Sequence, residues 1–366
     1  MKKITFALII VALLVSGCAA KTPKTETDKT IKIGSVLILS GEGAAWGTAT
    51  QKGIELALKD INKTGIDGKK LDVIYEDSKG DAKTAVSAYN KLTKIDEINM
   101  IVGGTWSNTG LAMSEPAKQD KTIFISPSLG LADFNESSEY FFNTWPHDAF
   151  LSAKLADVVY AAGKRNVALL AAQQVWVTAQ TQAFKSRFEQ LGGAVGFLTE
   201  PGVETKDVLT DITKIKNDAS LDAVVFTNGN YNLGVLYAQK LREFRIELPM
   251  YSITMDQKMI DAAQGAFDGL TYLTSLTPTD DFRKRFESTY NEPIDIGADS
   301  AYDAMMMLAE AIEVTDSTNS DTLAKYLNEI TTWDGVSGKL LSDGKGGFTK
   351  DFQKIKVVGG KPVSIQ

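Results

Sequence analysis

The chain has 366 residues, of which 43% are hydrophobic and 23% charged, and its formal net charge at pH 7 is −7. That balance is typical of a globular protein of about two domains, and the acidic charge excludes nucleic acid as a partner, because phosphates require a basic surface. One histidine and one cysteine are too few for the usual zinc ligand sets. We therefore expect no metal site, and no other motif calls for a cofactor.

The first 18 residues have the form of an export signal. Two lysines after Met1 precede an apolar run from Phe6 to Val15, which is too short to span a bilayer but has the length of a signal-peptide core. The sequence Val15-Ser16-Gly17-Cys18 resembles the cleavage and lipid-attachment site of bacterial lipoproteins. We predict a lipid anchor on Cys18, with residues 19–30 as a polar tether to the cell membrane on its periplasmic or outer side. An ordinary secretory signal with an incidental cysteine is the alternative, and it also predicts export.

Short apolar strands alternate with amphipathic helices from Ile31 onward. In the first half we expect strands at Ile31–Leu39, Leu71–Tyr75, Ile98–Val102 and Thr122–Ile125. The pattern restarts after Trp145, with strands at Asn166–Ala172, Ala194–Leu198, Leu221–Thr227, Pro249–Thr254 and Leu270–Thr274. Single helices between strands imply right-handed crossovers and parallel sheets covered on both faces. The fold class is therefore α/β, with two doubly wound parallel-sheet lobes and a ligand cleft between their strand ends.

Several stretches carry a resemblance to a known family. In the first lobe they are IKIGSVLILSGEGAAWGTATQKGIELALKDIN, GKKLDVIYEDSKGDAKTAVSAYNKL, INMIVGGTWSNTGLA and IFISPS, and further along the chain they are TKDVLTDITKIKND and GADSAYDAMMMLAEAI. They resemble the leucine-isoleucine-valine-binding proteins, which are type I periplasmic binding proteins of ABC importers. The resemblance implies three crossings between the lobes, near Trp145–Asp148, Ser275–Thr279 and Trp333–Gly347. Lobe 1 is then expected at residues 31–147 plus 278–338, and lobe 2 at 148–277 plus 339–366. We expect a monomer whose partner is an ABC permease in the membrane.

The loop from Thr105 to Thr109 lies between a predicted strand and a predicted helix. Free backbone N–H groups at a helix start, together with a hydroxyl, form a ready site for a carboxylate. The resemblance places the ligand carboxylate at Ser107, with Thr105 and Trp106 as neighbouring contacts. The alternative is that Ser107 or Asn108 only caps the helix.

The loop Ser126-Pro127-Ser128-Leu129-Gly130 follows the next strand. In amino-acid binders of the family, an alanine carbonyl and a threonine hydroxyl from this loop hold the ligand. The resemblance puts Ser128 and Gly130 at those positions, so the threonine hydroxyl is absent, which counts against an ordinary α-amino acid. Trp46, in a glycine-rich loop, falls where family members often carry an aromatic wall. Trp106 could form a second wall or pack beneath its own loop.

The second lobe offers fewer signals. Trp176 matches the place where the family commonly has a tyrosine, and Tyr231, which follows a strand end, is the better candidate for a ligand contact. Amino-acid binders also pair the ligand ammonium with an acidic residue of this lobe. Thr254 stands near that position, and Asp256 could substitute for the acid, although it could equally be a helix N-cap.

The prediction from these residues is a solute-binding protein that captures a small carboxylate-bearing compound (an amino acid, an amide or an aromatic acid) and delivers it to an ABC permease. A sensor module that signals to a membrane receptor is the alternative. A more distant one is an NAD(P)-dependent enzyme, because Gly41, Gly43 and Gly47 follow a strand and open a helix. No nucleophile elbow accompanies them, and a single histidine offers little as a general base. We therefore predict that the protein is not an enzyme.

Overall fold

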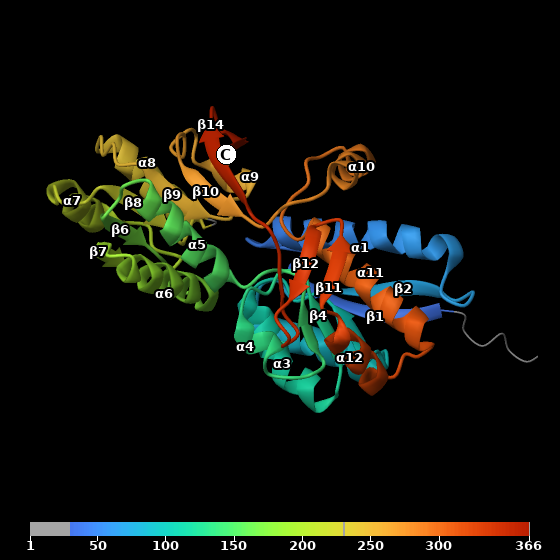
Figure 1. Ribbon diagram of the computed structural model, residues 1–366. Coiled ribbons are helices and arrows are strands. Elements are labelled where there is room, and N and C mark those ends of the chain that lie inside the picture. The colour runs from blue at the N-terminus through green and yellow to red at the C-terminus, as the bar shows by residue number, and fades with distance from the viewer. Residues whose placement is uncertain (1–29, 230, 366) are drawn as a thin grey trace, which may run out of the picture.

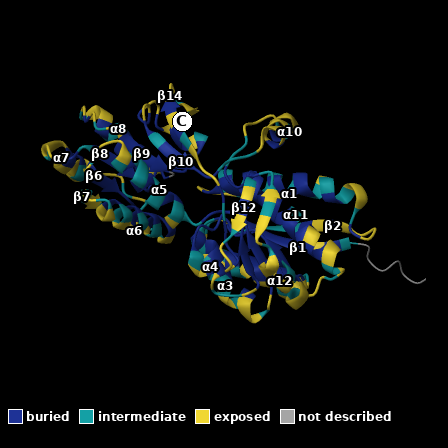
Figure 2. Cartoon of the chain, in the orientation of Figure 1, coloured by how far each residue is buried: buried dark blue, intermediate teal, exposed yellow. Residues whose placement is uncertain are grey.

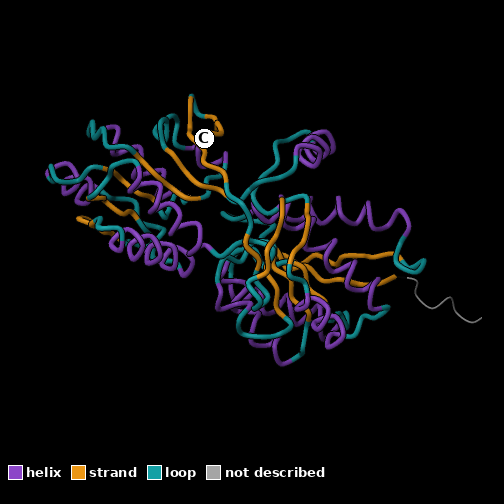
Figure 3. The backbone as a smooth tube through the Cα atoms, viewed as in Figure 1, coloured by secondary structure: helices purple, strands orange, loops and turns teal. Residues whose placement is uncertain are grey.

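The computed structural model describes residues 30–365, apart from Asn230. The signal peptide, Cys18 and the tether predicted at 19–30 lie outside these residues, except for Thr30, with which the first strand begins. Within the described range, no helix has both the length and the apolar character needed to cross a membrane. Two α/β lobes lie side by side, and the tube in Figure 3 shows strands at the centre of each lobe with helices around them.

Lobe 1 is built on a five-stranded parallel sheet. In spatial order its strands are β2 (Lys70–Asp77), β1 (Thr30–Leu37), β3 (Met100–Val102), β4 (Ile123–Ser126) and β5 (Phe141–Asn143). Its helices are α1 (Ala44–Thr64), α2 (Ala82–Asn90) with the π-helical turn η1 (Lys91–Ile95), α3 (Ser107–Gln119), α4 (Ala132–Asn135), α10 (Asp280–Tyr290), α11 (Ala298–Thr315) and α12 (Ser320–Glu329). Figure 1 shows the helices around the sheet, as single-helix crossovers require.

Helix α1 illustrates how the sequence pattern becomes packing. Ile54, Ala57 and Ile61 repeat at helical spacing and are buried in the core of lobe 1. Gly53 allows this helix to approach α11 closely, because a Cβ at that position would stand 2.1 Å from the carbonyl oxygen of Ala298. The same two helices cover the sheet on the side of β1, which is buried along nearly its whole length.

Lobe 2 has a seven-stranded sheet. Its order is β15 (Lys361–Ile365), β14 (Gln353–Val358), β10 (Thr271–Thr274), β9 (Met250–Ile253), β8 (Ala223–Phe226), β6 (Asn166–Leu170) and β7 (Ala194–Thr199). Its helices are α5 (Asp148–Ala161), α6 (Val175–Gln190), α7 (Leu209–Asn217), α8 (Asn232–Glu243) and α9 (Gln257–Ala262). The five predicted strands are parallel, which confirms the fold class. The C-terminal hairpin of β14 and β15 adds two antiparallel strands that the sequence did not predict.

The interior of each lobe is apolar, and in Figure 2 the buried residues follow the sheets and the inner faces of the helices. Lobe 1 has one large core cluster, and Trp46, Trp145 and Ile296 form a small separate one near the cleft. In lobe 2, Val224 and Phe226 of β8 belong to one cluster, whereas Ala223 and Val225 belong to another. Successive side chains of a strand point to opposite faces, so the sheet of lobe 2 is packed on both sides.

The third crossing differs from the prediction. Residues 339–349, which we expected in lobe 2, form most of β12 (Gly338–Ser342) and all of β13 (Phe348–Thr349), which pair with β11 (Thr332–Gly335) in a small sheet. This sheet belongs to lobe 1, since the backbone N–H of Asn143 donates to Gly346 and both Leu340 and Phe348 are in the core of lobe 1. The glycine-rich stretch is a tight loop closed on Asp343, not a linker. The chain therefore crosses at residues 350–352.

Candidate ligand-binding cleft

A small cavity lies between the lobes, at the carboxyl ends of parallel strands from both sheets. The residues that line it are Trp46, Trp106, Ser107, Ser128, Trp145, Asp148, Trp176, Gln180 and Thr254. Its free space is only about 10 Å³, which is the room of about one water molecule. The cavity lies at the sheet edges where the sequence predicts a cleft. Five of the candidate residues line it: Trp46, Trp106, Ser107, Ser128 and Trp176.

Aromatic rings meet across the cleft. Trp46 of lobe 1 lies 6.2 Å from Trp106 at an interplanar angle of 86°, and 6.4 Å from Trp176 of lobe 2 at 47°, measured between ring centroids. Trp106 also contacts Tyr231, at 5.8 Å, and packs against the core of lobe 2. These contacts join the two lobes through side chains that also face the cavity.

Tyr231 does not line the cavity, although the sequence made it the better candidate. It is only 2% exposed and stacks behind Trp176, with ring centroids 5.6 Å apart. Its hydroxyl oxygen accepts a hydrogen bond from Trp176 Nε1 at 3.0 Å. Burial raises the pKa of the Tyr231 phenol well above its usual range. Tyr231 therefore orients the Trp176 ring, and Trp176 is the residue at the cavity.

The loop before α3 carries the predicted carboxylate site. Helix α3 begins at Ser107, no side chain caps it, and Asn108 donates instead to the carbonyl of Gly80 at 2.9 Å. The capping alternative is therefore wrong for both residues. Thr105 does not reach the cavity: its hydroxyl is buried and accepts the backbone N–H of Ile38 at 3.3 Å, which fixes the loop to lobe 1.

Two residues on the cavity wall have a backbone conformation that side chains rarely adopt. Trp106 has a φ of 63° and Thr254 a φ of 38°. Such conformations cost about 1–3 kcal/mol each and concentrate at binding and active sites. Trp106 Nε1 is also buried without a hydrogen-bond partner among the described residues. The loop before α3 thus holds the Trp106 indole N–H, the Ser107 hydroxyl and the first-turn N–H groups of α3 close to one cavity.

Gly130 contributes in a way that the sequence did not predict. A Cβ at this position would stand 2.1 Å from Cγ of Asp148, so the carboxyl group of Asp148 occupies the space of a side chain at position 130. The backbone N–H of Asp148 donates to the carbonyl of Gly130 at 2.7 Å. Gly130 does not line the cavity, whereas Ser128 does, with its hydroxyl 3.4 Å from the carbonyl oxygen of Gly104.

Asp148 is the acidic residue of the cavity, and sequence reasoning missed it. It begins α5 directly after the first crossing and is the single charged residue among the described residues that line the cavity. Burial raises its pKa to about 7, although hydrogen bonds from Gln180 and Trp145 favour the charged form. Gln180 Oε1 is itself buried without a partner in the described part of the chain. The sequence feature that could have indicated Asp148 is an acidic residue at the first crossing together with a glycine at position 130.

Asp256 both caps a helix and ties the lobes together. Its Oδ1 accepts the backbone N–H of Met259 at 2.8 Å, so the N-cap interpretation holds. Its Oδ2 accepts Trp46 Nε1 at 3.3 Å, across the cleft. Burial raises the pKa of this carboxyl group. Asp256 thus contacts the Trp46 indole N–H and does not line the cavity. Thr254, two residues earlier in the chain, does line it.

Comparison with known proteins agrees with this architecture. Residues 30–361 match the family model described as periplasmic binding protein. The chain is 26% identical to the Leu/Ile/Val-binding protein BraC3 of Rhizobium johnstonii, over 98% of this chain and 99% of that protein.

Within the described residues, no group of three or more His, Cys, Asp and Glu side chains could hold a metal ion.

Two solved structures share the fold. The substrate-binding protein LivJ of Streptococcus pneumoniae, in complex with isoleucine, has a TM-score of 0.82 at 23% identity and covers 92% of this chain and 100% of its own. A solute-binding protein of an ABC transporter from Rhodopseudomonas palustris, in complex with 3,4-dihydroxybenzoic acid, has a TM-score of 0.81 at 20% identity and covers 92% and 96%. Because the family model spans nearly all described residues, the chain belongs to the periplasmic binding protein family.

Proposed function

We propose that this protein binds a small carboxylate-bearing solute between its lobes and delivers it to an ABC permease. The observation that carries the proposal is the uncapped start of α3, whose first residue, Ser107, lines the interlobe cavity. Backbone N–H groups at a helix N-terminus attract negative charge, and a carboxylate there also accepts from the serine hydroxyl. Ser128 and Trp106 Nε1 supply further donors on the same wall.

Ligand capture depends on closure of the two lobes. A solute on the α3 side touches lobe 1 first, and only the closed form adds Trp176, Gln180 and Thr254 of lobe 2. A ligand shifts a two-state equilibrium toward the form that contacts it better. The closed form then presents a joint surface of both lobes to the permease.

The similar proteins support this class of ligand. Isoleucine and 3,4-dihydroxybenzoic acid, which occupy the two neighbouring structures, both carry a carboxylate. The signal sequence ending in Val15-Ser16-Gly17-Cys18 supports export and a lipid anchor on Cys18, which would keep the lobes near the membrane. With its polar tether the protein stays within reach of a membrane partner.

A binding measurement tests the proposal. Purified mature protein is screened by thermal shift against leucine, isoleucine, amides, benzoate and methylated amino acids, and the strongest ligand is then titrated by calorimetry. The Ser107→Ala variant should bind it about 1–3 kcal/mol more weakly, as for a lost hydrogen bond to a charged group. Ser114→Ala, on the same helix with its hydroxyl bonded to the Leu111 carbonyl, is the matched control. Stabilisation by a neutral or purely cationic compound, with none by any carboxylate, would contradict the proposal.

A further inference from the structure

Four of the five tryptophans of the chain line the small cavity described above. We call Trp46, Trp106, Trp145 and Trp176 the tryptophan box. They come from α1, the loop before α3, the first crossing and α6, so segments distant in the sequence converge to place indole rings around a single point. The carboxylate site alone does not require four such rings.

The ring of Trp46 is parallel to neither of its two aromatic neighbours in the box. Trp46 is nearly perpendicular to Trp106, at 86°, and is tilted by 47° from Trp176. A planar aromatic acid stacked on one of these ring faces would meet a perpendicular neighbour edge-on, a geometry that aromatic pairs also adopt. Rings at steep angles also form the sides of a box around a rounded group, and aromatic cages of this kind recognise alkylated ammonium ions through the negative faces of their π-systems.

The charge around the box also favours a cation. Asp148 is in the cavity wall, and none of the described residues that line the cavity is basic. Asp256 lies behind Trp46, bonded to its Nε1. The one buried cation near the box, Lys350, has its Nζ 5.5 Å from the centroid of the Trp145 ring but is paired with Asp299 at 3.3 Å. The cavity therefore carries a carboxyl group without a protein counter-ion among its described walls.

We propose that the solute is a small zwitterion whose ammonium nitrogen carries methyl groups, with its carboxylate at Ser107 and its methylated nitrogen in the tryptophan box beside Asp148. This inference rests on the proposed function, because it keeps the carboxylate site and names the group at the other end. Ser107, Asp148 and the four rings line the same cavity, whose free space of about 10 Å³ is the room of about one water molecule, so the lobes have to separate to admit the solute and close again around it.

Methylation fits the hydrogen-bonding capacity of the site. A primary ammonium has three N–H donors and needs three acceptors once it is removed from water. Asp148 already accepts hydrogen bonds from Gln180 and Trp145. Among the described residues that line the cavity, Gln180 Oε1 is the buried acceptor without a partner. A di- or trimethylated ammonium keeps its charge but has one donor or none, and its methyl groups contact ring faces.

The test is a methylation series on the mature protein. Glycine, N-methylglycine, N,N-dimethylglycine and N,N,N-trimethylglycine are titrated by calorimetry and by tryptophan fluorescence, with leucine, benzoate and choline as comparison ligands. Affinity should rise at least tenfold from glycine to the trimethylated compound. Tighter binding of leucine or benzoate than of any methylated compound overturns the inference and leaves the proposed carboxylate ligand intact. If choline binds more tightly than trimethylglycine, both the zwitterion and the Ser107 carboxylate site are wrong. If none of the carboxylates binds, the proposed function itself is contradicted.

Variants separate the box from general apolar packing. Trp176→Phe keeps an aromatic face, whereas Trp176→Leu keeps only apolar volume, and both lose the hydrogen bond to Tyr231. We expect the leucine variant to bind trimethylglycine at least tenfold more weakly than the phenylalanine variant, with both folded by circular dichroism; equal affinities contradict a cation–π box. Asp148→Asn should weaken trimethylglycine binding at least tenfold, and the exposed Asp133→Asn should not. If Trp176→Leu fails to fold, the pair Trp46→Phe and Trp46→Leu gives the same comparison.

Discussion

The interiors of the two lobes bury apolar side chains almost throughout, whereas the cleft and its crossings bury carboxyl groups, an amide, an indole N–H and an ion pair. In the lobes, strands such as β4 and β8 are buried along their whole length. Around the cleft, Asp148, Gln180 and Asp256 stand beside backbone at positive φ. The difference shows that the lobes hold the fold together while the region between them carries groups that only a ligand or the opposite lobe completes.

The largest expected effect concerns the buried ion pair at the third crossing. The side chains of Lys350 and Asp299 are fully buried, with Nζ and Oδ2 3.3 Å apart. Lys350→Met leaves a buried charge without its partner, so we expect the free energy of unfolding to fall by about 3–5 kcal/mol. Urea unfolding followed by circular dichroism measures this loss.

A lobe interior supplies the control for this prediction. Tyr89 in lobe 1 is buried, and its hydroxyl is 2.7 Å from that of Thr122. The same hydroxyl donates to Asp120 Oδ2 at 3.0 Å, so Tyr89→Phe should lower the free energy of unfolding by about 1–2 kcal/mol, less than the loss of the buried ion pair. The double change Lys350→Met with Asp299→Leu should recover most of the loss. If the single Lys350→Met variant is as stable as Tyr89→Phe, the prediction that the buried ion pair at the crossing matters more than a hydroxyl inside a lobe is wrong.

The second prediction is a pH dependence set by Asp148. Burial raises its pKa to about 7 in the folded protein, against about 3.9 in the unfolded chain. The folded state therefore holds this proton more tightly, and the stability contributed by the protonated form is complete below about pH 4 and is lost as the pH rises through 7. Asp148→Asn cannot ionise, so it should gain on the wild type by about 1–4 kcal/mol between pH 4 and pH 8.

Thermal or urea unfolding of both proteins at these two pH values checks the difference. Other buried carboxyl groups, such as Asp295, whose burial raises its pKa to about 6, remain in both proteins and cancel in the comparison. An unchanged difference between wild type and variant at pH 4 and pH 8 would show that Asp148 is not buried as the structure has it.

The lobes follow from local patterns, which explains why they were predicted well. Apolar runs gave β1 at Thr30–Leu37 close to the predicted Ile31–Leu39, and the period of Ile54, Ala57 and Ile61 gave the buried face of α1. The C-terminal hairpin was missed because β15 is an edge strand and many residues of both β14 and β15 are exposed. The third crossing was misplaced because a glycine-rich loop closed on Asp343 has the same composition as a linker.

The site was predicted only in part, for a physical reason. Ser107 and Ser128 follow strand ends, so their place at the cleft depends on one lobe alone. Asp148 and Gln180 reach the cavity through packing between a crossing and α6, and no local period records that packing. Tyr231 was predicted to contact the ligand but lies behind Trp176. Its position after a strand end does not distinguish a residue of the cavity wall from a residue that supports the wall.

The smallest expected effect lies at the edge of the cleft, where the exposed Glu42 of lobe 1 accepts hydrogen bonds from Asn232 of lobe 2. Asn232 Nδ2 at the start of α8 donates to Glu42 Oε1 of lobe 1 at 3.4 Å. Glu42→Ala removes this contact from the closed form, so we expect about a twofold weaker affinity for any ligand that needs both lobes, or ~0.5 kcal/mol. Glu42→Gln keeps the acceptor and should bind like the wild type.

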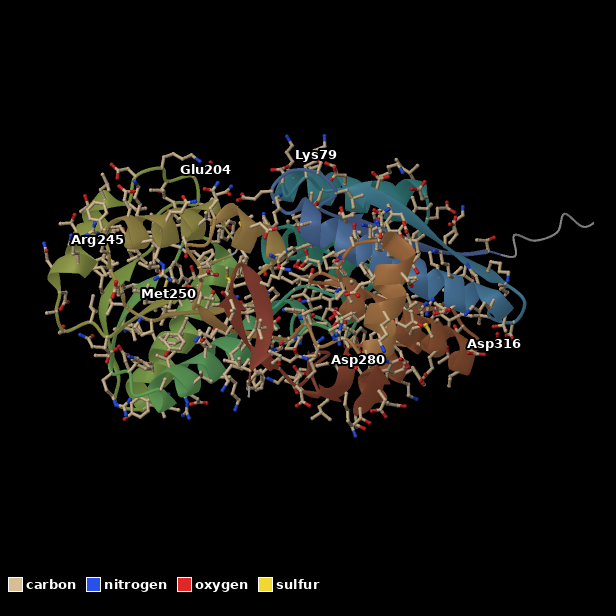
Figure 4. The ribbon with its side chains drawn as sticks, turned by 90° about the horizontal axis from the view of Figure 1, so that it is seen from above. Lys79, Glu204, Arg245, Met250, Asp280 and Asp316 are labelled. Atoms are coloured by element: carbon tan, nitrogen blue, oxygen red, sulfur yellow. The ribbon has the colours of Figure 1, made fainter. Side chains whose placement is uncertain are left out.

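Lys79→Ala provides a second control. Figure 4 shows Lys79 of lobe 1 and Glu204 of lobe 2 on the same edge of the molecule, and the side chain of Lys79 is exposed. A tenfold loss on Glu42→Ala would mean that the edge of the cleft, and not the tryptophan box, holds the lobes closed.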